Sequence, residues 1–413
     1  MTYYTDYAAD PVAHSGQPAD AIPTAAAPRR PWLLPVLACL ALSSAGAGAH
    51  FWSVSGTAGR SLTVSAASPA SAHHFSLPAY DPQGLKAEIP DWEAFKHRFI
   101  QPDGRVVDTG NGGVSHTEGQ GWGMLLAVAF DDRVTFDRIF DWTKQNLRRP
   151  DDALYAWRYD PANQRPVADT NNATDGDLFI AGALARAARR WHDERYAVAG
   201  DAIARSILTL LVRQVGGRTL LLPGATGFQR RDTVVVNPSY YVFPMFSELA
   251  ALTPSPLWAK LNADGLRLIA DARFGPSQLP PDWVQVSRAN GTLSVAPGWP
   301  ARFSFDAIRV PLYLAWSGDL TIDQRRVFTH FWGNGTHSPA WVDLQTGARA
   351  PYKAPSGMQA VIQLASVGGE QPLAQTPHVA EAQDYYSAAL TLLARVAWHE
   401  AVSNRMAKIA AGS

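Results

Sequence analysis

Residues 173–191 read ATDGDLFIAGALARAARRW, and this stretch indicates how the chain folds. Apolar residues recur at spacings of three and four from Ile180 to Trp191, which is the period of a helix that buries one face. Asp175 and Asp177 fall at its first turn, where Thr174 or Asp175 can serve as the N-cap. The sequence therefore predicts an amphipathic helix that begins with two acidic residues.

The same helical spacing recurs from about residue 76 onward and predicts about eleven helices. Gly- and Pro-rich segments separate them, and no change in composition divides residues 76–413, so we expect one domain. Only Thr219–Leu222 and Thr233–Val236 resemble strands, and they predict a small β-hairpin. So many short helices favour a closed barrel or toroid of helical hairpins, although periodicity does not separate it from a solenoid. The expected helices include residues 196–214, 241–252, 256–273, 306–316, 321–333, 357–366 and 381–402.

The composition indicates an uncharged partner. Lys plus Arg and Asp plus Glu both number 36 in the 413 residues, so no overall field attracts nucleic acid. The chain carries 14 Trp, 13 Tyr and 16 Phe, and such flat rings either grip sugar rings or fill the core. Its one cysteine, Cys39, excludes an intramolecular disulfide and every multi-cysteine metal site.

The N-terminal region is predicted to lie outside the fold. Residues 1–28 are polar and without helical periodicity, which is typical of a disordered tail. Arg29 and Arg30 precede the apolar run Trp32–Leu42 and then small residues, so residues 29–52 are interpreted as a signal peptide. A twin-arginine signal and an uncleaved inner-membrane anchor over residues 31–52 are the alternatives. Residues 53–75 are predicted to be a flexible linker, and the exported part is expected in the periplasm or outside the cell.

A second acidic residue, Glu118, lies in the segment SHTEGQGWG at residues 115–123. The pattern Ser115-x-x-Glu118 is that of a capping box, which explains it by helix stability alone. Three glycines in the segment weaken a helix, however, and indicate close approach of a ligand or another backbone. Trp122, one turn on, can form an apolar wall that raises the pKa of the carboxyl group, as a general acid requires.

A third acidic residue, Asp306, is expected at the first turn of another helix, with Ser304 as its N-cap. Arg309 follows three residues later on the same face and can keep Asp306 ionised, or form an ordinary surface ion pair with it. Glycosidic hydrolysis needs two opposed carboxyl groups, which these segments can supply. A divalent-cation site at Asp175 and Asp177 is the alternative, with Asp169 as the extra ligand.

Four segments together resemble the signature blocks of glycoside hydrolase family 8. They are SHTEGQGWGMLL at residues 115–126, ATDGDLFIA at 173–181, NPSY at 237–240 and FDAIR at 305–309, and they come in the family's order. Within the family, the segments LLPG at 221–224, PDWV at 281–284 and DAIRVPL at 306–312 look like periplasmic endoglucanases associated with bacterial cellulose synthesis. The resemblance implies an all-α (α/α)6 barrel with an open cleft, inverting hydrolysis of β-1,4-glucan, and neither cofactor nor metal.

The resemblance also implies roles for single residues. Glu118 matches the proton donor and Asp306 the base, while Asp175 is expected to bind and distort the sugar. Tyr240 matches a tyrosine that places the attacking water, and Arg309 an arginine beside the base. Further substrate-binding candidates, some for stacking on sugar rings, are Asp177, Trp157, Trp122 and Trp283.

The substrate and the partners are less closely specified by these residues. Xylan and chitosan are alternative substrates, because the acidic residues do not choose among the family's polysaccharides. A non-catalytic glucan-binding protein is the alternative from another class. The expected partners are β-1,4-glucan and, as a contact that the sequence does not test, a cellulose synthase complex. The chain is expected to be a monomer.

Overall fold

The computed structural model describes residues 84–412 except 334–337, 368–372 and 374–375. The predicted tail, signal or anchor, and linker of residues 1–75 lie outside the described residues. Among the residues that the structure describes, no helix combines the length and apolar character needed to span a membrane.

Eleven α-helices lie in the described part of the chain, which confirms the count expected from the sequence. The helix expected over residues 196–214 ends earlier, because β-branched Val212 begins a strand. Three short 3₁₀ helices also lie in the described residues, of which η3 (Pro238–Tyr240) belongs to the site described below. The helices are α1 (Ile89–Phe99), α2 (Thr117–Ala129), α3 (Arg133–Asn146), α4 (Thr174–Trp191), α5 (Glu194–Leu210), α6 (Phe243–Leu252), α7 (Pro256–Asp271), α8 (Arg309–Ser317), α9 (Ile322–Trp332), α10 (Ser356–Val367) and α11 (Tyr385–Gly412).

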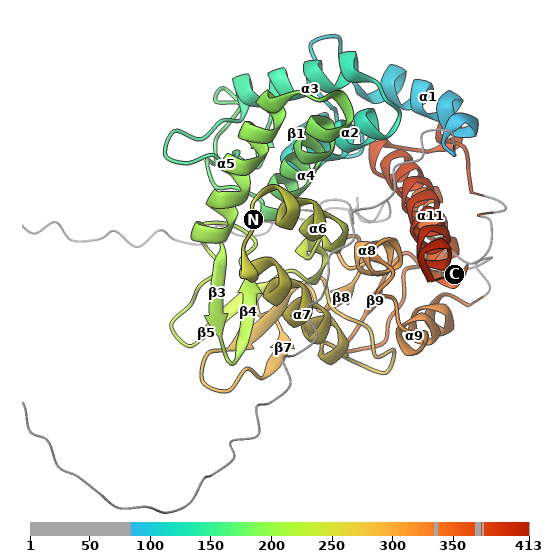
Figure 1. Cartoon of the computed structure of the whole chain (residues 1–413). Coiled ribbons are helices and arrows are strands. Elements are labelled where there is room, and N and C mark those ends of the chain that lie inside the picture. The colour runs from blue at the N-terminus through green and yellow to red at the C-terminus, as the bar shows by residue number, and fades with distance from the viewer. Residues whose placement is uncertain (1–83, 334–337, 368–372, 374–375, 413) are drawn as a thin grey trace, which may run out of the picture. The chain divides into compact units, whose positions relative to one another are not determined.

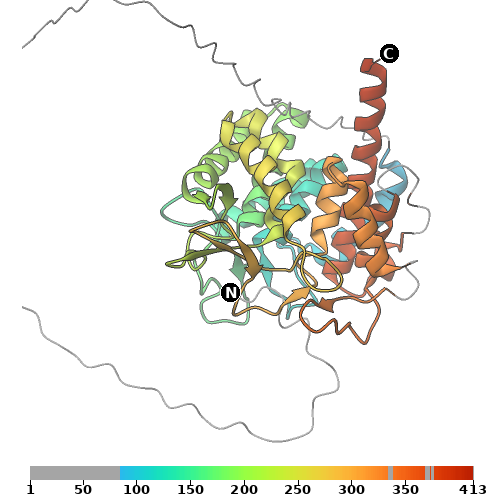
Figure 2. The same cartoon turned by 90° about the horizontal axis from the view of Figure 1, so that it is seen from below.

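The helices pack as hairpins around a closed ring (Figures 1 and 2). Successive contacts join α2 to α4, α4 to α6, α6 to α8 and α8 to α11, and α11 returns to α2. The other helices lie against this ring or against one another: α3 contacts α2, α5 contacts α4, α7 contacts α6, α10 contacts α8 and α11, α1 contacts α11, and α9 contacts α10. Because the ring closes, the arrangement is the expected helical barrel and not an open solenoid.

Glycines bring the two helices that carry predicted site residues close together. Every residue of α2 is buried, so the helix lies in the interior of the ring rather than on its surface. A Cβ at Gly121 would lie 2.6 Å from the Cβ of Phe179, and a Cβ at Gly176 only 2.2 Å from Oγ1 of Thr117. The glycines at these two positions therefore serve the contact of α2 with α4, and not the approach of a ligand.

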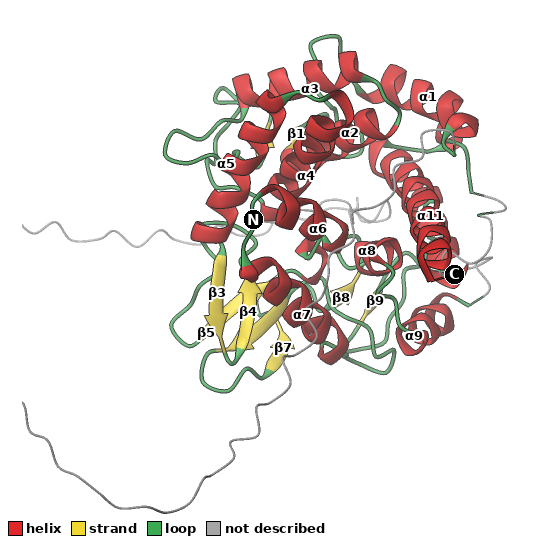
Figure 3. Ribbon diagram, viewed as in Figure 1, coloured by secondary structure: helices red, strands yellow, loops and turns green. Residues whose placement is uncertain are grey.

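Nine short strands in the described residues form four small antiparallel sheets. They lie beside the helices (Figure 3). The hairpin expected from residues 219–222 and 233–236 is wrong. The first segment pairs with β3, whereas β5 pairs with β6, Val236 opposite Val284. The strands are β1 (Ser115–His116), β2 (Arg158–Tyr159), β3 (Val212–Val215), β4 (Arg218–Leu221), β5 (Thr233–Val236), β6 (Val284–Ser287), β7 (Leu293–Val295), β8 (Arg302–Phe303) and β9 (Val342–Asp343).

Candidate active site

Glu118 lies in the first turn of α2, as expected, but the predicted capping box is absent. Ser115 belongs to strand β1 instead, where it pairs with Tyr159. The N-cap is His116, whose Nδ1 accepts the backbone N–H of Gly119 at 3.0 Å. Because the cap is a histidine, the carboxyl group of Glu118 is left free to point away from its own backbone.

Asp175 lies in the first turn of α4, and its cap also differs from the expectation. The N-cap position is Ala173, which makes no side-chain cap hydrogen bond. Thr174 instead donates its hydroxyl to the carbonyl of Leu222 at 2.6 Å. Asp175 Oδ1 accepts the N–H of Gly176 at 2.8 Å, which leaves Oδ2 for a partner outside the helix.

Asp306 lies in a turn before α8 and not in its first turn, so the predicted helix start at residue 306 is wrong. Ser304 is not its N-cap, because both its N–H and its hydroxyl are donated to the carboxylate of Asp282. The turn is followed by Arg309, the first residue of α8, whose N–H bonds the carbonyl of Asp306 at 3.1 Å.

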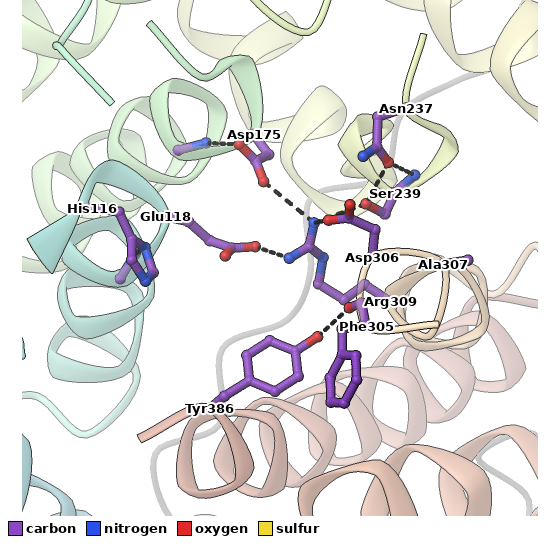
Figure 4. A network of polar contacts seen from close by, with 12 residues as sticks. His116, Glu118, Asp175, Asn237, Ser239, Phe305, Asp306, Ala307, Arg309 and Tyr386 are labelled. Atoms are coloured by element: carbon purple, nitrogen blue, oxygen red, sulfur yellow. Dashed lines mark hydrogen bonds and ion pairs between the residues drawn. The ribbon is translucent and has the colours of Figure 1, made fainter. Parts of the chain in front are cut away.

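The guanidinium group of Arg309 brings all three carboxyl groups together (Figure 4). Its Nη1 forms an ion pair with Glu118, and its Nη2 lies 2.9 Å from Oδ1 of Asp306 and 3.5 Å from Oδ2 of Asp175. Glu118 and Asp306 therefore face opposite sides of one cation. Arg309 is 1% exposed, so the pair with Asp306 is a buried contact and not the ordinary surface pair that the spacing also allowed.

Burial raises the pKa of Glu118 well above its ordinary value. The charge of Arg309 opposes this rise, and the nearby carboxyls of Asp175 and Asp306 add to it. Burial also raises the pKa of Asp175, while Arg309 and the N–H of Gly176 lower it. The nearby carboxyl group of Asp175 thus favours the protonated form of Glu118, whose pKa it raises.

Burial raises the pKa of Asp306 to about 7, although Arg309 works against the rise. The charges of Asp282 and Asp175 raise this pKa further, and the Asn237 side chain lowers it. Burial alone would lower the pKa of Arg309, but the surrounding carboxyl groups hold it well above its ordinary value, so the cation persists.

The block NPSY supports this cluster from η3. Asn237 Oδ1 accepts the N–H of Ser239 at 2.9 Å and its hydroxyl at 2.7 Å. Ser239 Oγ in turn accepts from Nη2 of Arg309 at 2.8 Å. Tyr240 ends the same turn, is 1% exposed, and places its ring 6.0 Å from that of Trp283. The turn thus places a tyrosine beside the cluster and fixes the guanidinium.

The tryptophans proposed for stacking on sugars are more deeply buried than expected. Trp122 is 0% exposed and packs against Phe179, so it presents no open face in this structure. Trp283 is 4% exposed, and Phe228 and Trp299 stack on it with ring centroids 5.8 and 5.1 Å away. Within this stack of three rings one, Trp299, is half-buried, and the sequence analysis did not single it out. We therefore leave Trp122 out of the proposed substrate-binding residues.

Trp157 and the acidic residues beside it hold the loops around α4. Trp157 is 9% exposed and donates its indole N–H to Asp169 at 2.8 Å. Asp177 is 0% exposed and accepts the N–H of Tyr155 at 3.0 Å and the amide of Asn172 at 2.8 Å. Burial raises the pKa of Asp177 to about 8. Its place below the surface favours support of the site over direct contact with a sugar.

The considered metal site finds no support in this arrangement. Asp169 uses its other oxygen to accept the N–H of Asn171 at 2.9 Å. Within the described ranges, no group of three or more His, Cys, Asp or Glu side chains could hold a metal ion.

Several residues that shape the site escaped the sequence analysis. His116 caps Gly119 within its own segment, but histidine is not a usual N-cap residue type. Asp282 had no local signal, because its partners Ser304 and Ala307 follow more than 20 residues later. Ser239 lies in the block NPSY, directly before Tyr240, and this neighbour could have indicated a role for Ser239 in the same site. Tyr386 of α11 donates its hydroxyl to the carbonyl of Phe305 at 2.5 Å and so fixes the residue before Asp306 (Figure 4).

Comparison with known proteins agrees with this geometry. The family model described as glycosyl hydrolases family 8 matches residues 79–400. The chain belongs to this family. A probable endoglucanase of Novacetimonas hansenii is 47% identical over 325 residues, which are 78% of this chain and 93% of that protein. An endoglucanase of Cellulomonas uda is 45% identical over 276 residues, which are 65% of this chain and 75% of that protein.

Solved structures of family 8 enzymes share the fold. The endo-β-1,4-glucanase CMCax from Acetobacter xylinum matches with a TM-score of 0.74 and 45% identity, over 78% of this chain and all of that chain. An endoglucanase from Klebsiella pneumoniae matches with a TM-score of 0.72 and 43% identity, over 75% of this chain and 99% of that chain. The (α/α)6 barrel implied by the sequence motifs is thereby confirmed.

Proposed function

We propose that this glycosidase is an endo-acting β-1,4-glucanase that inverts the configuration of the sugar it cleaves. The observation that carries the proposal is the contact of Glu118 and Asp306 with two different nitrogens of Arg309, the pKa of Glu118 being well above its ordinary value and that of Asp306 about 7. Relatives with 45–47% identity are endoglucanases by name, which favours a β-1,4-glucan as the substrate.

In the proposed mechanism, Glu118 gives its proton to the glycosidic oxygen as the bond to the sugar breaks. Asp306 takes a proton from a water molecule that attacks the opposite face of the ring. Inversion requires a separation of about 6.5–9.5 Å between the two carboxyl groups to admit this water. The hydroxyl of the water bonds to the sugar carbon; Asp306 then releases its new proton to solvent and Glu118 takes one up, which restores the starting state.

The other residues assist these two carboxyl groups. Arg309 keeps Asp306 ionised for part of the population at neutral pH, as a base must be. Asp175, whose Oδ2 lies 3.5 Å from Nη2 of Arg309, is assigned the binding of the sugar at the cleavage point. Tyr240 ends the turn whose Ser239 accepts from Arg309, and it is assigned the orientation of the attacking water.

The direct test is the anomer released at early times. Cellohexaose followed by proton NMR should yield α-configured reducing ends first, and early release of β-configured ends contradicts the assignment of acid and base. Glu118→Gln and Asp306→Asn should each lower kcat by at least about a hundredfold. Unchanged hydrolysis in Glu118→Gln supports the non-catalytic glucan-binding alternative.

A matched control separates chemistry from folding. Glu248 is 0% exposed, like Glu118, but pairs with Arg186 and Arg189 far from the three carboxyl groups. Glu248→Gln should lower the free energy of unfolding without lowering kcat of the folded fraction. Comparable loss of kcat in this variant would point to general destabilisation.

We also propose that the enzyme is exported and acts in bacterial cellulose synthesis. The support is the basic and apolar pattern of residues 29–52 and the likeness to a glucanase of Acetobacter xylinum. Cell fractionation with an activity assay tests export: activity confined to the cytoplasm contradicts it. Co-purification of the full chain with a cellulose synthase complex tests the second point.

A further inference from the structure

The segment PDWV at residues 281–284 contains a buried carboxyl group that the proposed mechanism does not use. Asp282 is 7% exposed and lies just before strand β6. Its backbone N–H bonds the carbonyl of Arg302 at 2.7 Å. Arg302 belongs to β8, the strand that leads into the turn carrying Asp306. Asp282 is therefore tied to the segment that presents the base.

The side chain of Asp282 holds this turn on both sides of Asp306. Its Oδ1 accepts the N–H of Ser304 at 3.0 Å and the N–H of Ala307 at 2.8 Å, and its Oδ2 accepts the hydroxyl of Ser304. The turn precedes α8 and has few backbone hydrogen bonds of its own: the N–H of Ile308 bonds the carbonyl of Ser304 at 2.9 Å and the N–H of Arg309 bonds that of Asp306 at 3.1 Å. The carboxylate of Asp282 adds three side-chain hydrogen bonds to these.

The hydrogen bonds to the turn do not by themselves require a negative charge at Asp282. An asparagine could accept both N–H groups through its own Oδ1 and donate to Ser304 Oγ. A second buried carboxyl beside Asp306 is costly, because like charges and burial both oppose ionisation. Burial raises the pKa of Asp282 as well, although Ser304, Ala307 and Arg309 hold it down. This cost of burying a second carboxylate has a reason if the negative charge of Asp282 makes Asp306 a stronger base.

The groups that face Asp306 come from several elements. Arg309 of α8 and the Asn237 side chain favour its ionised form, whereas Asp282 and Asp175 of α4 oppose it. Among the groups that oppose it, Asp282 contributes more than Asp175. We propose that Asp282 is a positioning residue for Asp306, which fixes its turn and strengthens it as a base through like charge. This inference rests on the proposed role of Asp306.

The test is the pH dependence of kcat/KM with cellohexaose, which carries no titrating group of its own. In Asp282→Asn the hydrogen bonds to the turn can persist while the charge is lost. The acid limb, which reports ionisation of the base, should move to lower pH by roughly one unit. Asp282→Ala removes the hydrogen bonds as well, and kcat should fall about a hundredfold.

Two controls make the shift specific. Asp264 is also 7% exposed and accepts a backbone N–H, from Thr219 at 2.7 Å, but it lies on α7 beside Arg267. Asp264→Asn should leave the acid limb in place. Ser304→Ala keeps the charge of Asp282 and loses one hydrogen bond, so it should lower kcat without moving the limb.

The outcomes separate the inference from the function on which it rests. An acid limb in Asp282→Asn that stays at its wild-type position, or an equal shift in Asp264→Asn, overturns the role of Asp282. An Asp306→Asn variant that keeps its activity overturns the assignment of the base itself. If Asp282→Ala does not fold, the Asp282→Asn profile still decides.

Discussion

Replacement of Arg309 by methionine tests the cluster at its centre. Arg309 contacts Glu118, Asp306 and Asp175, so its removal leaves three buried carboxyl groups without a cation. An opposite charge at such distances lowers a carboxyl pKa by about 1–3 units. Without it, the pKa of Asp306 should rise from about 7 to between about 8 and 10.

This rise sets the expected loss of activity. Asp306 must be ionised to act as a base, so activity is lost as the pH falls through its pKa. At pH 7 the ionised fraction should drop from about half to between about one tenth and one thousandth. The acid limb of kcat/KM with cellohexaose should therefore move upward, in the direction opposite to that expected for Asp282→Asn. An acid limb at the wild-type pH in Arg309→Met refutes the reasoning.

The stability of the same variant has its own pH dependence. A carboxyl group whose pKa is raised by folding binds its proton more tightly in the folded state. The free energy of unfolding of the protein therefore falls as the pH rises above the pKa of that group in the unfolded chain, which is near 4. Arg309→Met should consequently be most destabilised at alkaline pH and least below about pH 4. Urea unfolding between pH 4 and 9 measures this trend.

Arg186→Met is the matched control for this variant. Arg186 is 7% exposed and pairs with Glu248 at 2.9 Å and with Glu400 at 2.6 Å. Breaking a buried ion pair costs about 3–5 kcal/mol, so the control should be destabilised to a similar degree. Its acid limb should stay in place, because its carboxyl partners take no part in the proposed reaction.

Three further outcomes are expected. His116→Ala removes the N-cap of α2, so it should lower the free energy of unfolding by about 1 kcal/mol and also lower kcat. Thr321→Ala removes the N-cap of α9 and is the control, because it should cost as much stability and leave kcat unchanged. Trp299→Ala should raise KM for cellohexaose about fivefold with little change in kcat, because one aromatic contact contributes roughly 1 kcal/mol; an unchanged KM would place Trp299 off the sugar path. Dialysis against a chelator should leave activity intact, and a loss reversed by added divalent cations would revive the metal site at Asp175.

Helical periodicity was enough to predict the number of helices and the burial of α4. It could not predict closure of the ring, because closure depends on contacts between helices distant in sequence, such as α2 with α11. The strand pairing failed for the same reason: β5 finds its partner in β6, on the far side of two helices, and not in neighbouring β4.

The helix caps show where local patterns mislead at this site. Serine and threonine are common N-cap residues, yet Ser115, Thr174 and Ser304 do not cap the helices that follow them. Ser115 pairs in a strand, Thr174 donates its hydroxyl to the carbonyl of Leu222, and Ser304 donates its hydroxyl to Asp282. For Ser304 the competing partner is Asp282, 22 residues earlier in the chain. Spacing did predict the contact of Asp306 with Arg309, because three residues along one turn suffice to bring them together.

Charge balance explains why such a cluster already holds the proton that the proposed reaction consumes. Glu118, Asp175 and Asp306 would carry three negative charges against the single positive charge of Arg309 if all were ionised. Uncompensated charge is expensive in a buried site, so protonation relieves it. We assign this proton to Glu118, because burial and both neighbouring carboxyl groups raise its pKa well above its ordinary value. Burial raises the pKa of both Glu118 and Asp306, which suits the acid but not the base. Asp306 can therefore act as a base only because the charge of Arg309 lowers its pKa, so one cation sets the ionisation of the base beside the buried acid.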